Sequence, residues 1–297
     1  MRIKVTGRCN RECFFCHAEG GVRNAEDITW TPELEDFLAK TSQAFNIKNI
    51  SLTGGEPLLH DGLMDFVAKI HESGHFESFS LTTNGTIDKG KSFWKELRAY
   101  GLNKVSLSIS DILEEKYHNN QVKLLSILND LDIKASVNVV VYNDAMYTKS
   151  VIRRLFEINW QYNFKVVLLP NLLNYDFSKR VIDQICTDFE CELVGVRTPK
   201  NSSNRLHHYR TKADNDLYVK TTKEDKKAIT LDGFCDSCKV KDSCQEGFYG
   251  LRIEQAEGIH YVRGCIHKSD KETVIPIKDF SQSSLYKTLE RNYNKEE

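Results

Sequence analysis

A chain of 297 residues, 40% hydrophobic and 28% charged, is long enough to bury a sizeable core and has the composition of a soluble globular protein. Its 41 basic and 42 acidic residues leave a net charge of −1, so overall charge favours neither nucleic acid nor an acidic membrane surface as a partner. We find no signal peptide and no apolar run of the ~18 residues that a membrane span needs, and we therefore expect a cytoplasmic protein.

Short apolar runs alternate with amphipathic stretches over the first two-thirds of the chain. The runs predict six strands, at Arg2–Thr6, Asn49–Thr53, Ser78–Thr82, Lys104–Ile109, Lys134–Tyr142 and Phe164–Leu169. Helices are predicted between them, one starting at Thr31 and Pro32, one after Asp61, and three over residues 93–100, 113–131 and 148–159. Strand–helix units in series predict parallel strands joined by right-handed crossovers. An open doubly wound sheet and a barrel both fit this α/β pattern.

The composition changes near Thr198, where a polar and charged stretch begins. We interpret residues 198–230 as a connecting segment between two domains. The first domain is predicted over residues 1–197, and a smaller cysteine-bearing domain with a C-terminal tail over residues 231–297.

Cys9, Cys13 and Cys16 have the spacing C-x3-C-x2-C and directly follow the first predicted strand. An irregular loop of this kind can fold three thiolates around an iron–sulfur cube. Three ligands leave one iron open, which is typical of a catalytic site rather than a structural one. The alternative is a zinc site completed by His17 or His60.

A glycine pair followed by an acidic residue and a proline, Gly54–Pro57, ends the second predicted strand. Two glycines let the backbone approach a ligand closely, and the carboxylate of Glu56 can accept hydrogen bonds from an ammonium group. Placed one strand after the cysteine triplet, this turn is a strong joint signal of a binding site.

The segments RIKVTGRCNRECFFC, SLTGGEPLL, LTTNGT, KVSLSIS and VNVVVYNDA together resemble the radical SAM (S-adenosylmethionine) superfamily, and more narrowly the GTP 3′,8-cyclase (MoaA) family. The resemblance covers roughly residues 2–170 and 234–266. It implies a partial (β/α)6 TIM-like barrel with a small C-terminal cysteine-rich auxiliary-cluster domain. It also implies an enzyme whose N-terminal 4Fe–4S cluster cleaves SAM to a 5′-deoxyadenosyl radical, which then abstracts hydrogen from a substrate.

The resemblance assigns the SAM contacts by position. It implies that Gly54, Gly55 and Glu56 hold the methionyl amine, and that Thr83 and Ser108 contact SAM from strand ends. Asn138 matches an asparagine of the fifth strand, and Phe15 occupies an aromatic position before the third cysteine, where loop packing and adenine contact are both possible roles.

A second cysteine group comprises Cys235, Cys238 and Cys244, with the spacing C-x2-C-x5-C, and Cys265. The cyclase family carries a second 4Fe–4S cluster on three cysteines here, which Cys235, Cys238 and Cys265 match, and Cys244 is an additional candidate ligand. The C-x2-C-x5-C portion also resembles the SPASM domain of peptide-modifying radical SAM enzymes. A four-cysteine zinc site is the alternative, and three or four cluster ligands both remain open.

The cyclase pattern is incomplete in this chain. Arg2 matches an arginine that the cyclases use on the nucleotide, but Lys239 and Lys241 stand where the family has an Arg-x-Arg pair. The chain ends Asn294–Glu297 instead of in two glycines, and Ser136 replaces a lysine. Lysine binds phosphate as a point charge without the planar fork of arginine. We therefore expect a related enzyme that acts on another substrate.

The expected function is radical chemistry on a small-molecule, possibly nucleotide-like, substrate in cofactor or natural-product biosynthesis. Its expected partners are that substrate and an electron donor such as flavodoxin or ferredoxin, with no nucleic acid and no membrane. Two alternatives stay open: modification of a peptide precursor, and, in another class, a non-catalytic iron–sulfur or zinc-binding protein.

Overall fold

A computed structural model describes residues 1–16, 26–109, 112–198, 204–222, 234–236, 238–239, 241, 244, 250–265 and 274–293. The chain divides into two compact units. The first comprises Met1–Thr82, Ala99–Leu102 and Glu224–Glu297, and the second comprises Thr83–Arg98 and Asn103–Lys223. His17 and the last four residues lie outside the described ranges.

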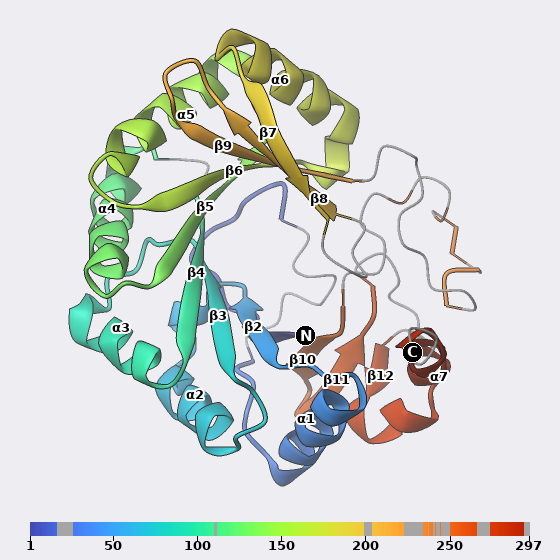
Figure 1. Cartoon of the computed structure of the whole chain (residues 1–297). Coiled ribbons are helices and arrows are strands. Elements are labelled where there is room, and N and C mark those ends of the chain that lie inside the picture. Colours follow the sequence, from blue (N-terminus) through green and yellow to red (C-terminus); the bar gives the residue numbers. More distant parts are fainter. Residues whose placement is uncertain are drawn as a thin grey trace. The chain divides into compact units, whose positions relative to one another are not determined.

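The first unit is a mixed sheet with helices, and it contains both ends of the chain (Figure 1). Its strand order is β12-β11-β10-β1-β2-β3. Strands β10, β1, β2 and β3 are parallel neighbours, while β11 pairs antiparallel with β10 and β12 pairs antiparallel with β11. The elements are β1 (Arg2–Thr6), α1 (Pro32–Ala44), β2 (Asn49–Gly54), η2 (Pro57–Leu59), α2 (Leu63–Glu72), β3 (Ser78–Thr83), β10 (Arg252–Ala256), β11 (Ile259–Arg263), β12 (Val274–Pro276), η5 (Ile277–Gln282) and α7 (Ser284–Tyr293).

Helix α1 begins as its sequence predicts. The Thr31 hydroxyl accepts a hydrogen bond from the backbone N–H of Leu34 at 3.2 Å, and Pro32 supplies the fixed φ of the first turn. Its buried side includes Leu34, Phe37 and Leu38. Phe37 reaches the C-terminal segment, where its ring meets Phe280 edge-on at 5.5 Å, so α1 joins the two ends of the chain in one core.

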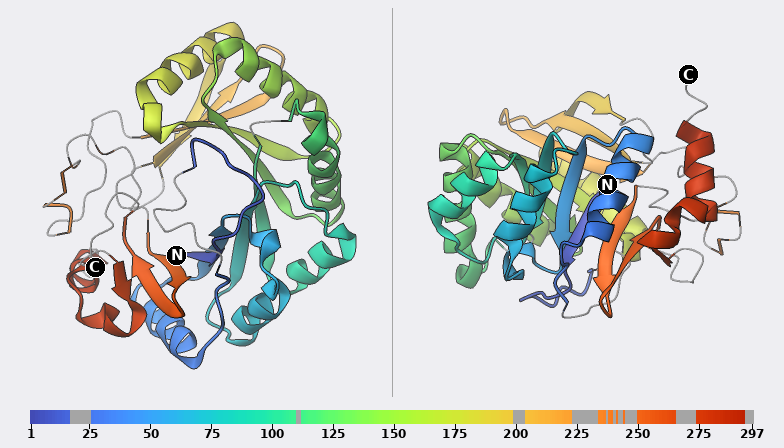
Figure 2. Two further views of the ribbon diagram at one scale, coloured as in Figure 1. Left: turned by 180° about the vertical axis from the view of Figure 1, so that it is seen from behind. Right: turned by 90° about the horizontal axis from the view of Figure 1, so that it is seen from below.

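The second unit has the strand order β4-β5-β6-β9-β8-β7. Strands β4, β5, β6 and β9 are parallel neighbours, and β9, β8 and β7 are antiparallel. Helices α4, α5 and α6 follow one another along one side of these strands (Figures 1 and 2). The elements are α3 (Gly90–Ala99), β4 (Leu102–Ser108), α4 (Glu115–Asp130), β5 (Lys134–Val141), α5 (Ala145–Asn159), β6 (Phe164–Pro170), η3 (Leu172–Asn174), α6 (Tyr175–Asp188), β7 (Glu192–Arg197), β8 (Asn204–Arg210) and β9 (Asp216–Thr222).

The six predicted strands are confirmed, with β4 beginning and ending slightly earlier than its apolar run suggested. Residues 204–222, within the segment expected to connect two domains, form β8 and β9. Their polar composition hides the alternation that makes them strands: Leu217 and Val219 are buried, while Tyr218 between them points to the other face and stacks on His208. Among the described residues, no helix is both long enough and apolar enough to span a bilayer.

Candidate functional site

The first cysteine group lies on the loop that leaves β1. Cys9 and Cys16 are exposed and Cys13 is partly buried, and none of them is in a disulfide. Residues 7–16, the described part of the loop, form no helix or strand, and a turn in which the N–H of Cys16 donates to the carbonyl of Cys13 at 3.0 Å brings the last two cysteines together. The three thiols can therefore reorient toward one point without unwinding a regular element.

The glycine turn after β2 is bonded to this loop through the backbone. The N–H of Gly55 donates to the carbonyl of Thr6 at 2.8 Å, and the N–H of Glu56 donates to the carbonyl of Arg8 at 2.7 Å. A Cβ at Gly54 would lie 2.6 Å from the Thr6 oxygen, and a Cβ at Gly55 would lie 2.1 Å from the Arg8 oxygen. Both glycines are thus required because the cysteine loop occupies the space of their side chains.

Glu56 is fully buried directly behind that contact. Its carboxylate accepts a hydrogen bond from the N–H of Leu58 at 3.1 Å and so caps η2, whose first residue is Pro57. An ionised carboxylate can accept several hydrogen bonds at once. The cap fixes the direction of the carboxylate, which suits it to hold a ligand ammonium.

The thiol of Cys9 is not prepared to ionise on its own. Although Cys9 is exposed, partial desolvation by its surroundings raises its pKa, and the negative charges of Glu56, Cys13 and Cys16 raise it further, against a hydrogen bond from the backbone of Arg11 that lowers it. Cluster iron removes such protons by binding the thiolates directly. The donor set, three thiols of one loop that influence one another electrostatically, fits a 4Fe–4S cluster with one iron left for an exchangeable ligand.

A set of hydrogen bonds to Asp27, which we call the Asp27 clasp, joins the start of the cysteine loop to its exit. No sequence motif marks it. Asp27 accepts hydrogen bonds from the hydroxyl of Thr6 at 2.6 Å, from Nε of Arg8 at 3.2 Å and from the N–H of Asp61 at 3.0 Å. Burial would raise the pKa of Asp27, but these hydrogen bonds outweigh it and lower the pKa. Sequence reasoning missed Asp27 because its partners come from two separate segments, at Thr6 with Arg8 and at Asp61.

The remaining predicted SAM contacts in the barrel lie in the second unit. The hydroxyl of Thr83, the last residue of β3, accepts a hydrogen bond from the N–H of Gly85 at 3.1 Å. Ser108 ends β4 and stands opposite Asn138 of β5, whose carbonyl accepts a bond from the N–H of Ile109 at 3.0 Å. The strand register thus places Ser108 and Asn138 at one level of this unit's sheet.

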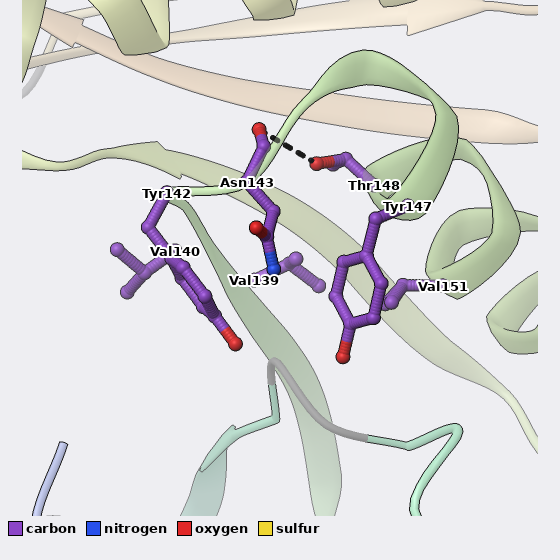
Figure 3. A pocket seen from close by; sticks show the side chains of 7 residues that line it. All are labelled: Val139, Val140, Tyr142, Asn143, Tyr147, Thr148 and Val151. Carbon is purple, nitrogen blue, oxygen red and sulfur yellow. Dashed lines mark hydrogen bonds between the residues drawn. The ribbon is translucent and has the colours of Figure 1, made fainter.

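A small pocket opens at the end of β5 in the same unit (Figure 3). Its empty volume of about 160 Å³ includes open solvent, so the pocket is too shallow to enclose a ligand. Its lining consists of Val139, Val140, Tyr142, Asn143, Tyr147, Thr148 and Val151. The hydroxyl of Thr148 contacts the carbonyl of Asn143 at 3.5 Å across it, so the pocket is a packing feature of the β5–α5 junction.

The second cysteine group combines a turn-rich segment with the end of a strand. The N–H of Cys238 donates to the carbonyl of Cys235 at 3.0 Å, and the N–H of Cys244 donates to the carbonyl of Lys241 at 3.4 Å. Cys265 is buried just past β11. These two parts meet beside Gly264, where a Cβ would lie 3.2 Å from the ring of Phe234.

Four further predicted residues, Phe15, Lys239, Lys241 and Arg2, lie in the first unit. Phe15 meets Phe14 edge-on at 5.4 Å within the cysteine loop. The ammonium of Lys241 pairs with Asp236 at 2.8 Å, inside the second cysteine group, and Lys239 is exposed. Arg2 lies on β1 opposite Arg252 of β10. Within the described ranges, no three His, Cys, Asp or Glu side chains are already arranged to hold a metal ion.

Comparison with known proteins places this geometry in context. Residues 3–143 match the Radical SAM superfamily. The probable GTP 3′,8-cyclases of Methanothermobacter marburgensis and Methanocaldococcus jannaschii are 38% identical over 117 residues, which is 39% of this chain and 37% and 38% of theirs. The GTP 3′,8-cyclase of Staphylococcus aureus strain Mu3 is 26% identical over 282 residues, covering 88% of this chain and 80% of that protein. The solved structure of histidine-tagged anSMEcpe with bound AdoMet has a TM-score of 0.58 and 18% identity over 99% of this chain and 81% of that one.

The chain therefore carries a radical SAM domain, and the predicted resemblance to the GTP 3′,8-cyclases is confirmed. The solved structure supports the fold alone and confirms the predicted α/β partial barrel. The match spans little more than a third of the length of the two archaeal cyclases. The superfamily implies SAM and one 4Fe–4S cluster.

Proposed function

We propose that this chain, with its radical SAM domain over residues 3–143, cleaves SAM reductively and uses the product on a small-molecule substrate. One observation carries the proposal. Backbone hydrogen bonds join the Gly55–Glu56 turn to the carbonyls of Thr6 and Arg8, immediately before the first cysteine. A cluster on the loop would then lie next to an ammonium group bound by Glu56. A ligand that chelates the cluster iron through its amine and carboxylate requires this arrangement.

The residues of the loop have separate proposed roles. Cys9, Cys13 and Cys16 would hold the cluster, and Glu56 would accept the amine of SAM through charge-assisted hydrogen bonds. When bound, the cluster supplies the electron that splits SAM into methionine and a 5′-deoxyadenosyl radical, which takes a hydrogen atom from the substrate. The remaining proposed SAM contacts are Gly54, Gly55, Thr83, Ser108, Asn138 and Phe15.

The second cysteine group is proposed to hold an auxiliary 4Fe–4S cluster in the domain expected over residues 231–297. Cys235, Cys238 and Cys265 are its proposed ligands, and Cys244 is a fourth candidate. The contact of Gly264 with Phe234 supports this proposal, because it draws the chain beside Cys235 to the chain beside Cys265. With three ligands the cluster would keep an open iron for substrate, and with four it would be closed.

The proposed substrate is a nucleotide-like or other compact molecule, with Arg2, Lys239 and Lys241 as candidate contacts. The S. aureus relative is a GTP 3′,8-cyclase, but we expect little GTP cyclisation here, since Lys241 is paired with Asp236 and lysine lacks the fork of arginine. A flavodoxin- or ferredoxin-like protein is the proposed electron donor. Modification of a peptide remains the second candidate, favoured by the spacing of Cys235, Cys238 and Cys244.

The test is an anaerobic assay of reconstituted protein with dithionite and SAM, in which 5′-deoxyadenosine should be released. Glu56→Ala should weaken SAM binding by ~1.5–3 kcal/mol, because the ammonium loses a charge-assisted bond. Glu77→Ala is the matched control, since Glu77 is exposed and its carboxylate pairs with the surface residue Lys48. Wild-type protein that binds iron yet releases no 5′-deoxyadenosine would contradict the proposed function.

Substrate choice is tested separately, with GTP in the same assay and the cyclised product followed after oxidation to a fluorescent pterin. We expect far less product than from a genuine cyclase run in parallel. Comparable rates would show that the two lysines restore the phosphate site.

A further inference from the structure

Two cysteines, Cys186 and Cys191, belong to neither cysteine group and lie where α6 passes into β7 in the second unit (Figure 1). Each thiol is partly buried, and neither is in a disulfide. In a continuous helix, five positions would turn the two side chains about 140° apart. Whether the thiols meet therefore depends on how α6 ends.

Helix α6 ends in a Schellman motif whose first and last residues are these two cysteines. The N–H of Cys191 donates to the carbonyl of Cys186 at 2.8 Å, and the N–H of Glu190 donates to the carbonyl of Thr187 at 3.0 Å. Glu190 has a φ of 47°, the left-handed conformation that this motif places just past the helix end. The side chains at the two ends of the motif commonly contact each other, so the turn brings the thiols together.

The turn is also held from outside. The carbonyl of Phe189 accepts a hydrogen bond from the N–H of Lys212, in the connection between β8 and β9, at 3.1 Å. The ring of Phe189 meets Phe156 of α5 edge-on at 5.9 Å, and the ammonium of Lys212 pairs with the carboxylate of Glu190 at 2.7 Å. The two cysteines are therefore held near each other before any bond forms between them.

The two thiols are chemically unequal. A hydrogen bond joins their side chains, and it lowers the pKa of Cys191, although partial burial acts in the opposite direction. The same hydrogen bond raises the pKa of Cys186, and burial and the negative charge of Asp183 raise it further. The thiolate is the form of cysteine that attacks a disulfide, so Cys191 is the attacking residue and Cys186 keeps its proton.

We propose that Cys186 and Cys191 form a reversible dithiol–disulfide site that exchanges with low-molecular-weight disulfides. The Cys191 thiolate attacks one sulfur of R–S–S–R, the bond between the two sulfurs breaks, and R–S⁻ leaves and takes a proton from water. Cys186 then releases its proton to water and attacks the sulfur of Cys191, which expels the second R–S⁻. Two cysteine thiols are thereby oxidised by two electrons, and one small disulfide is reduced to two thiols.

The closed bond would join the last turn of α6 to the residue that precedes β7. It would cross-link two positions that the Schellman motif already holds together, so closure requires no unfolding of α6 or β7. The site goes beyond the proposed function and does not rest on it, because none of its residues belongs to either cysteine group.

The experiment maps the site by mass. Full-length, anaerobically reconstituted protein is treated with oxidised glutathione, quenched in acid, alkylated under denaturing conditions and digested with trypsin. Trypsin should release residues 181–197 as one peptide, whose only cysteines are Cys186 and Cys191. We expect this peptide to be two hydrogen atoms lighter than its reduced form, to resist alkylation, and to return to the dithiol with dithiothreitol. A wild-type peptide that is alkylated at both cysteines, that keeps glutathione instead of an internal bond, or that is linked to another peptide would overturn the proposal.

Serine variants assign the two roles. Cys186→Ser should stop at a stable glutathione adduct on Cys191, because the resolving thiol is missing. In Cys191→Ser, the remaining Cys186 should react roughly tenfold more slowly than Cys191 does in the first variant, because it keeps its proton. Equal rates in the two variants would overturn the assignment of Cys191 as the attacking residue.

Two substitutions at Glu190 test whether the turn makes the site. Glu190→Gly and Glu190→Val both remove the ion pair with Lys212, but only glycine accepts a positive φ without strain. Closure of the disulfide should therefore be roughly tenfold slower in Glu190→Val than in Glu190→Gly, if the Schellman motif brings the thiols together. Equal rates of closure in these two variants would show that the motif does not form the site.

Discussion

The two cysteine groups differ in how much of the chain must fold before their thiols can meet. The first lies within one loop, from Cys9 to Cys16, and backbone bonds to a neighbouring turn brace it. The second needs the pairing of β1 with β10 and of β10 with β11 before Cys265 comes near Cys235. When all the cysteines of a site lie in one loop, their spacing in the sequence is enough to recognise the site. When tertiary structure brings the cysteines together, their spacing does not reveal how many of them are ligands.

The comparison does not mean that the groups are independent. The exit of the first loop is bonded to the hairpin that carries Cys265. Glu26 accepts hydrogen bonds from the N–H of Glu257 at 2.6 Å and of Gly258 at 3.2 Å, at the turn between β10 and β11. Through these bonds, order in one cysteine region supports order in the other.

The largest expected effect comes from removing the first group. Cys9→Ala, Cys13→Ala and Cys16→Ala combined should abolish release of 5′-deoxyadenosine and lower iron from about eight to about four atoms per chain, if both groups hold 4Fe–4S clusters. Cys186→Ala, outside both groups, is the control and should keep all the iron. Retained SAM cleavage in the triple variant would show that the loop is not the catalytic cluster site.

The second group is tested by single substitutions that sharpen the comparison. Cys265→Ala should remove about four of about eight irons, since a cluster site closed by tertiary structure loses an essential ligand. Cys244→Ala then tests whether the second cluster has three or four cysteine ligands. If this variant loses as much iron as Cys265→Ala, four cysteines are ligands, and if it loses no iron, three are. Metal analysis that finds zinc near one equivalent per chain, with only about four irons, would show that this group is a structural zinc site.

Much of the fold was predictable because its signals are local. Apolar runs mark the strands, and Thr31 with Pro32 marks the start of α1, since a cap and a fixed φ act within one turn. Strands β8 and β9 were harder, because half of each faces a polar surface and only Leu217 and Val219 show the buried period. The glycine turn was predicted as a ligand cradle, but its closest neighbour is the cysteine loop's own backbone.

The features missed from sequence are those that join distant segments. Asp27 bonds Thr6, Arg8 and Asp61, and strand register places Arg2 of β1 opposite Arg252 of β10, which is about 250 positions away in the chain. Neither of these two features has a fixed residue spacing that a sequence motif could describe. The roles of Thr83, Ser108 and Asn138 stay predictions.

A smaller effect is expected from Gly55→Ala, which tests whether the turn braces the loop. The new Cβ would meet the Arg8 carbonyl at 2.1 Å, and backbone cannot move aside cheaply, so the variant should lose ~1–3 kcal/mol of stability and retain less iron in the first group. Gly195→Ala is the matched control, because nothing lies within 4 Å of its Cβ. Chemical unfolding and iron analysis measure both. Equal behaviour of the two variants would argue that the turn and the loop are not in contact in solution.

The smallest expected effect concerns the clasp at Asp27, and it depends on pH. Because hydrogen bonds lower the pKa of Asp27 in the folded state, its carboxylate adds stability above the ordinary pKa of ~3.9, and this stability is lost as the pH falls through the lower folded value. The partner Arg8 is 33% exposed, so we expect a loss of only ~1 kcal/mol for Asp27→Asn at pH 7. In urea unfolding of iron-free protein, the gap between wild type and variant should stay constant from about pH 7 to about pH 5 and narrow below about pH 4. Asp36→Asn is the control, since its side chain is 59% exposed and its carboxylate pairs only with the surface residue Lys40 of the same helix among the described contacts. A gap that stays constant to the lowest pH would mean that Asp27 acts through packing rather than through its charge.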